Sequence, residues 1–140
     1  MSHDPLAHLP LLPLALAALT ACESKAEREA DAAQDLIEHQ AKQRAVAAGD
    51  TIAALGLTER QLLDANLVAV NGTELGDVEQ IRRDGAGVVT GLLVEIEDSN
   101  PDRFVVVPIN GLTVRVTGDD RDVQTTMTAQ DLARLPDAKL

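Results

Sequence analysis

The hydrophobic and polar residues divide the chain into three stretches with different patterns. Residues 9–21 are apolar and carry no charge, whereas residues 23–50 are rich in Ala, Glu, Gln, Lys and Arg. Residues 51–140 contain short apolar runs separated by Gly, Pro, Asn and Asp. Such runs between turn residues are typical of β-strands. The pattern therefore predicts an apolar leader, a helix and one β-rich domain.

The second stretch predicts a helix of about 25 residues, which would reach on the order of 35–40 Å at 1.5 Å per residue. It lacks proline, and its first glycine, Gly49, is expected to end it. Its apolar positions follow three- and four-residue steps on one narrow, mostly alanine side. Two uses stay open: a solvated stalk, or a helix that packs weakly against the domain or a second copy. We assign His39 to the solvent face.

The third stretch predicts six short strands and two short helices. Thr58 with Gln61, and Thr128 with Asp131, have the spacing of a capping box, which predicts a helical turn after each threonine. The expected strands cover residues 67–70, 75–81, 88–96, 104–108, 112–116 and 122–126. The dipeptide Asn71-Gly72 predicts a hairpin between the first two. Strands at this spacing favour a small closed or nearly closed barrel, because closure leaves no sheet edge free.

The apolar leader is too short to cross a membrane, since its 13 residues compare with the roughly 20 that a spanning helix needs. Its length is typical of the core of a secretory signal. The residues that end it, Leu19, Thr20, Ala21 and Cys22, resemble the lipobox of bacterial lipoproteins. The resemblance implies cleavage before Cys22 and attachment of diacylglycerol to its thiol. Residues 1–8 depart from the pattern because they contain no Lys or Arg, and the alternative is a buried apolar helix with an incidental cysteine.

Charge and composition exclude several classes of function. The net charge is −11, and the aromatic residues are limited to Phe104, so neither a basic patch nor stacking side chains are present to bind nucleic acid. No histidine follows His39, and a lipidated Cys22 would not serve as a nucleophile, so we expect no catalytic site. No cofactor motif is present either.

Two acidic segments have some features of a cation site. Residues 98–102 carry the first three ligand positions of a calcium loop, but Arg103 and Ile109 stand where Gly and Glu are required. The cluster of Asp119, Asp120 and Asp122 is explained by the chemistry of a hairpin turn. We therefore predict no metal site, although calcium bridging between copies stays open at the second cluster.

Residues 72–81, Asp84, residues 88–94 and residues 105–108 together resemble the PRC-barrel family. The resemblance covers roughly residues 62–136 and implies a β-barrel with a docking role. The matching motif positions are turn and core residues, so the resemblance implies architecture and not chemistry. These positions are Gly72, Leu75, Gly76, Val78 and Pro108.

The sequence as a whole predicts a signal peptide at residues 1–21, a lipidated cysteine with a helical spacer at 22–50, and a mainly β domain at 51–140. We expect a non-enzymatic protein of the cell envelope, anchored to a membrane and facing the periplasm, whose domain binds a protein partner or a second copy. One alternative is a periplasmic ligand- or ion-binding sensor with its site around Asp98 and Asp120. Another is a cytoplasmic assembly factor, which requires that the leader is not cleaved.

Overall fold

A computed structural model describes residues 24–140, so the expectations for Leu19, Thr20, Ala21 and Cys22 lie outside the described residues. The predicted helix is confirmed as α1, Lys25–Ala48. Ser24 caps its start, because the Ser24 hydroxyl accepts from the Glu27 amide while the Glu27 carboxylate accepts from the Ser24 amide. Gly49 ends it with a positive φ of 56° and bonds back to the Ala45 carbonyl.

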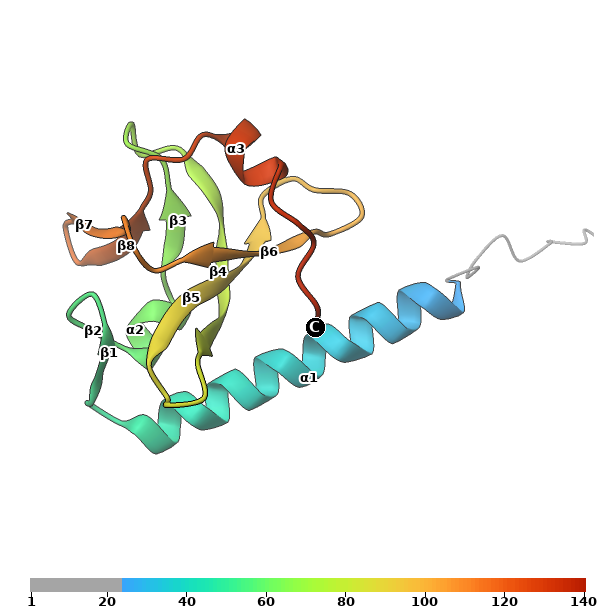
Figure 1. Ribbon diagram of the computed structural model, residues 1–140, viewed down its shortest axis with the longest axis horizontal. Coiled ribbons are helices and arrows are strands. Elements are labelled where there is room, and N and C mark those ends of the chain that lie inside the picture. Colours follow the sequence, from blue (N-terminus) through green and yellow to red (C-terminus); the bar gives the residue numbers. More distant parts are fainter. Residues whose placement is uncertain (1–23) are drawn as a thin grey trace, which may run out of the picture.

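Only the second half of α1 packs against the rest of the molecule. Residues 24–32 are exposed, whereas Ile37, Ala41 and Ala45 are buried. Figure 1 shows α1 running along the domain and projecting beyond it at its N-terminal end. Of the two uses left open, α1 thus combines a projecting segment with a segment that packs. No helix in residues 24–140 has the length and apolar character needed to cross a membrane.

A short hairpin and a one-turn helix follow α1. The hairpin strands are β1, Ile52–Ala54, and β2, Leu57–Thr58, and the helix is α2, Glu59–Leu63. The predicted capping box is confirmed, since the Thr58 hydroxyl accepts from the Gln61 amide and the Gln61 side chain accepts from the Thr58 amide. The Arg83 guanidinium donates to the buried carboxylate of Glu59 and so joins α2 to the sheet.

The main sheet has six strands in the order β6-β5-β4-β3-β8-β7. The strands are β3 (Asn66–Val68), β4 (Glu74–Arg83), β5 (Val89–Ile96), β6 (Phe104–Pro108), β7 (Thr113–Thr117) and β8 (Asp120–Gln124). The predicted hairpin at Asn71-Gly72 is confirmed by antiparallel pairing of β3 with β4. Pairing of β3 with β8 is parallel. The C-terminal helix α3, Ala129–Ala133, begins at the predicted Thr128–Asp131 capping box.

The predicted closed barrel is wrong. The sheet ends at β6 on one side and at β7 on the other, and these strands do not pair with each other. Part of the β6 edge is met by the C-terminal segment instead, where the Ala138 amide donates to the Phe104 carbonyl at 2.8 Å. A closed barrel would have no free edge at β6, whereas here a short chain segment covers part of that edge.

The core lies on one face of this sheet, and helices cover it. Leu92 and Val94 of β5 belong to the core cluster, together with Leu62 of α2 and Leu132 of α3. Because successive side chains of a strand point to opposite faces, Leu93 points to the other face, and it is fully buried too. Strand β5 is therefore covered on both sides.

Candidate functional site

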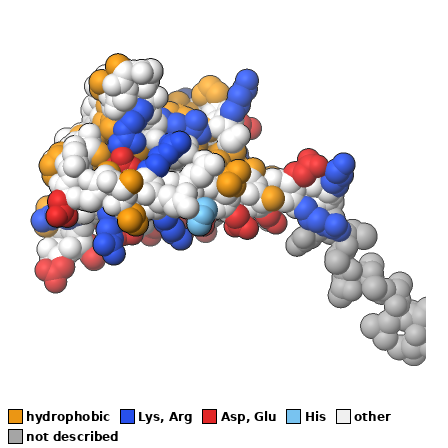
Figure 2. Space-filling view, turned by 90° about the horizontal axis from the view of Figure 1, so that it is seen from below, with side chains coloured by type: hydrophobic (Ala, Val, Ile, Leu, Met, Phe, Trp, Pro, Cys, Tyr) orange, Lys and Arg blue, Asp and Glu red, His pale blue; other side chains and the backbone are white. Residues whose placement is uncertain are grey.

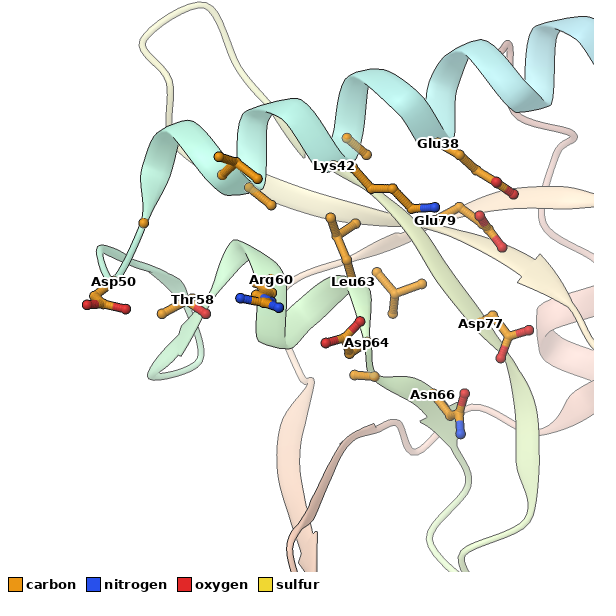
Figure 3. Close-up of a pocket in the computed structure, with 16 residues that line it drawn as sticks. Glu38, Lys42, Asp50, Thr58, Arg60, Leu63, Asp64, Asn66, Asp77 and Glu79 are labelled. Carbon is orange, nitrogen blue, oxygen red and sulfur yellow. The ribbon is translucent and has the colours of Figure 1, made fainter.

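In the described part of the chain, a cleft of about 750 Å³ lies between α1, α2 and β4. Its apolar lining includes Ala41, Ala45 and Leu63, and charged residues surround that lining. Figure 3 shows Glu38 and Lys42 reaching from α1 toward Glu79 of β4. The cleft therefore lies at the place where the helix docks on the domain.

Five carboxylates form a continuous row beside this cleft, and we call them the acidic row. They are Glu74, Asp77, Glu79, Glu95 and Glu97. Asp77, Glu79 and Glu95 each place a carboxylate oxygen within 4.8 Å of the other two, as do Glu74, Asp77 and Glu97. The row arises from strand pairing, because Asp77 of β4 lies directly opposite Glu95 of β5. Like charges directly opposite each other destabilise a sheet.

Glu79 is the most perturbed member of the row. Burial is the largest cause that raises its pKa to about 8, followed by its hydrogen bond with Glu95 and the negative charge of that residue. The charges of Glu38 and Asp77 raise the pKa further. Burial also raises the pKa of Glu95, whereas its hydrogen bond with Glu79 lowers it. At neutral pH Glu79 therefore keeps its proton and donates a hydrogen bond to the Glu95 carboxylate.

The basic side chains near the cleft do not neutralise the row. Lys42 and Arg60 both line the cleft, and Figure 3 shows the Lys42 ammonium directed toward Glu79. Within residues 24–140, however, no ion pair joins either of them to a carboxylate. Glu38 accepts a long 3.5 Å hydrogen bond from the Gln34 side chain instead. The interface therefore has an excess of negative charge.

In chemical terms the row can exchange protons or offer oxygen ligands. Each trio could supply three carboxylate oxygens to a hard divalent cation, which prefers such ligands. Exposed acidic groups also gather in this way without an ion. His39 is exposed on α1 and its ring hydrogen-bonds with the Gln43 side chain at 3.0 Å, which confirms its assignment to the solvent face.

The acidic loops at residues 98–102 and 119–122 differ from the acidic row in their arrangement. In the described chain, neither Asp98 nor Asp120 belongs to a trio of converging acidic or histidine ligands. Asp122 accepts a hydrogen bond from the Asn66 amide at 3.2 Å and thereby ties β8 to the start of β3. Asp119, Asp120 and Asp122 line a second, smaller hollow of about 410 Å³. Their main visible role is in the turn and the strand pairing.

The five motif residues occupy structural positions. Gly72 lies in the β3–β4 turn with a φ of 87°, which favours glycine. Leu75, Gly76 and Val78 are buried in β4. A Cβ at Gly76 would lie 2.3 Å from the Glu95 carbonyl oxygen, so close approach of β5 requires glycine there. Pro108 is exposed at the end of β6.

No family model matches the chain, and no curated protein matches it.

The acidic row was not foreseen from the sequence. Alternation along β4 places Asp77 and Glu79 two residues apart, which is a signal for one shared face. Their approach to Glu95 depends on the register between β4 and β5, which shifts between Val78 and Gln80. Neither that irregularity nor the position of Glu38 over it can be read from local sequence.

Proposed function

We propose that this chain is a lipid-anchored protein of the cell envelope, attached at Cys22 and facing the periplasm. Its β-rich domain serves as a non-enzymatic docking module for a protein partner or a second copy. The PRC-barrel resemblance of the sequence is part of this proposal, with an open sheet in place of a closed barrel.

The observation that carries the proposal is the arrangement of α1. The helix starts at Lys25, three residues after Cys22, and residues 24–32 are exposed. A helix of 24 residues is about 36 Å long. Figure 2 shows its N-terminal end standing away from the domain, with acidic and basic side chains along it. This geometry suits a spacer between an anchor and a folded domain.

The anchor is tested by feeding cells an alkyne-tagged fatty acid and isolating the protein. We expect label on the wild-type chain, and we expect Cys22→Ser to lose both the label and the membrane fraction. A Ser24→Ala chain serves as the control, because it alters a neighbouring residue without touching the thiol. A Cys22→Ser chain that still carries label and sediments with membranes would refute the proposal.

The docking role is tested separately by size-exclusion chromatography with light scattering and by crosslinking in intact cells. A specific crosslinked species that requires the folded domain supports docking, whether it is a dimer or a complex with another protein. A monomer without crosslinks in cells, together with a melting temperature that rises with calcium, would favour the ion-binding alternative instead.

A further inference from the structure

The attachment of α1 to the domain is small and incompletely packed. Its buried residues are Ile37, Ala41 and Ala45, two of which have the smallest apolar side chain available. The cleft of about 750 Å³ lies beside them. Val46, which follows Ala45 and also lines the cleft, is 83% exposed. The helix therefore depends on few contacts, and a modest electrostatic change at this interface can alter its position.

Charged groups face Glu79 from every element around it. Glu38 and Lys42 come from α1, Asp77 from β4, Glu95 from β5, and Asp102 from the β5–β6 loop beside Glu95, while Arg60 and Asp64 of α2 line the same cleft. Five of these seven are acidic. Lys42 and Arg60 are both exposed and free of ion pairs in the described chain, so solvent screens their charge.

We propose that α1 is a proton-controlled arm: it docks on β4 and α2 while the Glu79–Glu95 pair holds a proton, and it detaches when the pair is fully ionised opposite Glu38. With the proton in place, Glu79 is neutral and donates to Glu95. Without it, two adjacent carboxylates on the sheet face a third on the helix. Movement of the helix relieves this repulsion while β4 and β5 stay paired in the sheet.

The titration of the pair sets the direction of the switch. The pKa of Glu79 is raised to about 8, so the proton is held at neutral pH and is lost in mildly alkaline solution. Detachment is therefore expected on raising the pH, and docking on lowering it. The inference concerns residues 24–140 only and does not depend on whether Cys22 carries a lipid.

The test measures the distance between α1 and the sheet by double electron–electron resonance. The full chain is used in mild detergent with Cys22, its only cysteine, replaced by serine. Nitroxides are attached at Gln40→Cys on α1 and Thr117→Cys on β7, both of which are exposed positions. We expect one narrow distance distribution at pH 6. At pH 9.5 a second, broader population should appear. The ratio of detached to docked helix should rise about tenfold, which corresponds to a pKa of the Glu79–Glu95 pair about one unit lower in the detached state than in the docked state.

Two variants and one control decide the outcome. Glu79→Gln keeps the hydrogen-bond donor and removes the charge, so the narrow distribution should persist at both pH values. Glu38→Gln should do the same from the helix side, and it decides the matter where Glu79→Gln fails to fold. Glu29→Gln removes one charge from the projecting half of α1, and it should switch like the parent. A parent chain with the same distribution at both pH values, or a Glu79→Gln or Glu38→Gln chain that still switches, would overturn the inference.

Discussion

The raised pKa of Glu79 predicts that a single neutralising substitution stabilises the protein, and that it does so only at higher pH. A carboxyl group whose pKa is higher in the folded state binds more protons in that state than in the unfolded chain. Stability therefore falls as the pH rises between the two pKa values and changes no further above them. For Glu79 this window extends from its ordinary value of 4.5 to about 8. Glu79→Gln removes the titration and keeps an amide that can donate to Glu95.

The size of the effect follows from the width of the window. A shift from 4.5 to about 8, at 1.36 kcal/mol for each pKa unit, gives an upper limit of about 5 kcal/mol. Because Glu79 is only half buried, water and salt screen much of this energy, and we expect about 1–2 kcal/mol. Glu79→Gln should therefore differ little from the wild type in its free energy of unfolding at pH 5, which lies close to the lower end of this window. At pH 9 it should exceed the wild type by about 1–2 kcal/mol.

The measurement is urea unfolding at both pH values, followed by far-ultraviolet circular dichroism because the chain contains no Trp or Tyr. Repeating it in 0.5 M NaCl should reduce the gain at pH 9, since salt screens repulsion between partly exposed carboxylates. Glu29→Gln controls for the loss of one negative charge from this acidic chain. Equal stabilisation by Glu79→Gln at pH 5 and pH 9 would show that the gain has another cause, and the titration argument would then fail.

Three further predictions concern the sheet and its surroundings. Gly76→Ala should lower the free energy of unfolding by about 2–4 kcal/mol in the same urea experiment, because the new Cβ would lie 2.3 Å from the backbone oxygen of Glu95. Gly85→Ala is the control, and it should change the free energy of unfolding by less than about 1 kcal/mol because there is open space around Gly85. Arg103→Lys should increase amide exchange in the segment after α3 without unfolding the sheet, because the guanidinium donates to the last carbonyl of α3 and to one carbonyl and one carboxylate of that segment. Unchanged exchange would contradict this role of Arg103. Asp120→Asn should leave any effect of calcium on the melting temperature unaltered, because Asp120 belongs to no trio of converging carboxylates in the described chain. A loss of that effect would show that calcium binds at the loop that contains Asp120.

Elements fixed by short-range chemistry were predicted well from the sequence. The capping box at Thr58 and Gln61 involves residues three apart, so the pattern of the sequence contains the whole interaction. The strand Phe104–Pro108 was predicted to the residue, because a polar break precedes a run of β-formers there. The hairpin of β1 and β2 was missed, since its turn places Leu55 at a φ of 53°, where a non-glycine residue gives no advance signal.

Features that depend on distant contacts were not predicted well. Closure of the sheet requires β6 and β7 to meet, and nothing in either strand says that the C-terminal segment reaches β6 first. The acidic row likewise depends on the pairing of Asp77 with Glu95 and on the place where α1 crosses β4. The alternation of apolar and polar residues indicates which face of a strand is buried, but not which strand pairs with it. The candidate site depends almost entirely on such pairing.

The two experiments on Glu79 distinguish charge repulsion within the sheet from charge repulsion between the sheet and α1. Repulsion between Glu79 and Glu95 acts within the ladder and lowers the stability of the whole domain. Repulsion between Glu79 and Glu38 acts across the docking interface and displaces α1. If Glu79→Gln raises the free energy of unfolding at pH 9 while Glu38→Gln leaves it unchanged, the unfavourable charge belongs to the sheet, and the helix is free to stay docked. If both substitutions raise it, the charge is shared with α1, and the movement of the arm is the route by which the protein relieves it.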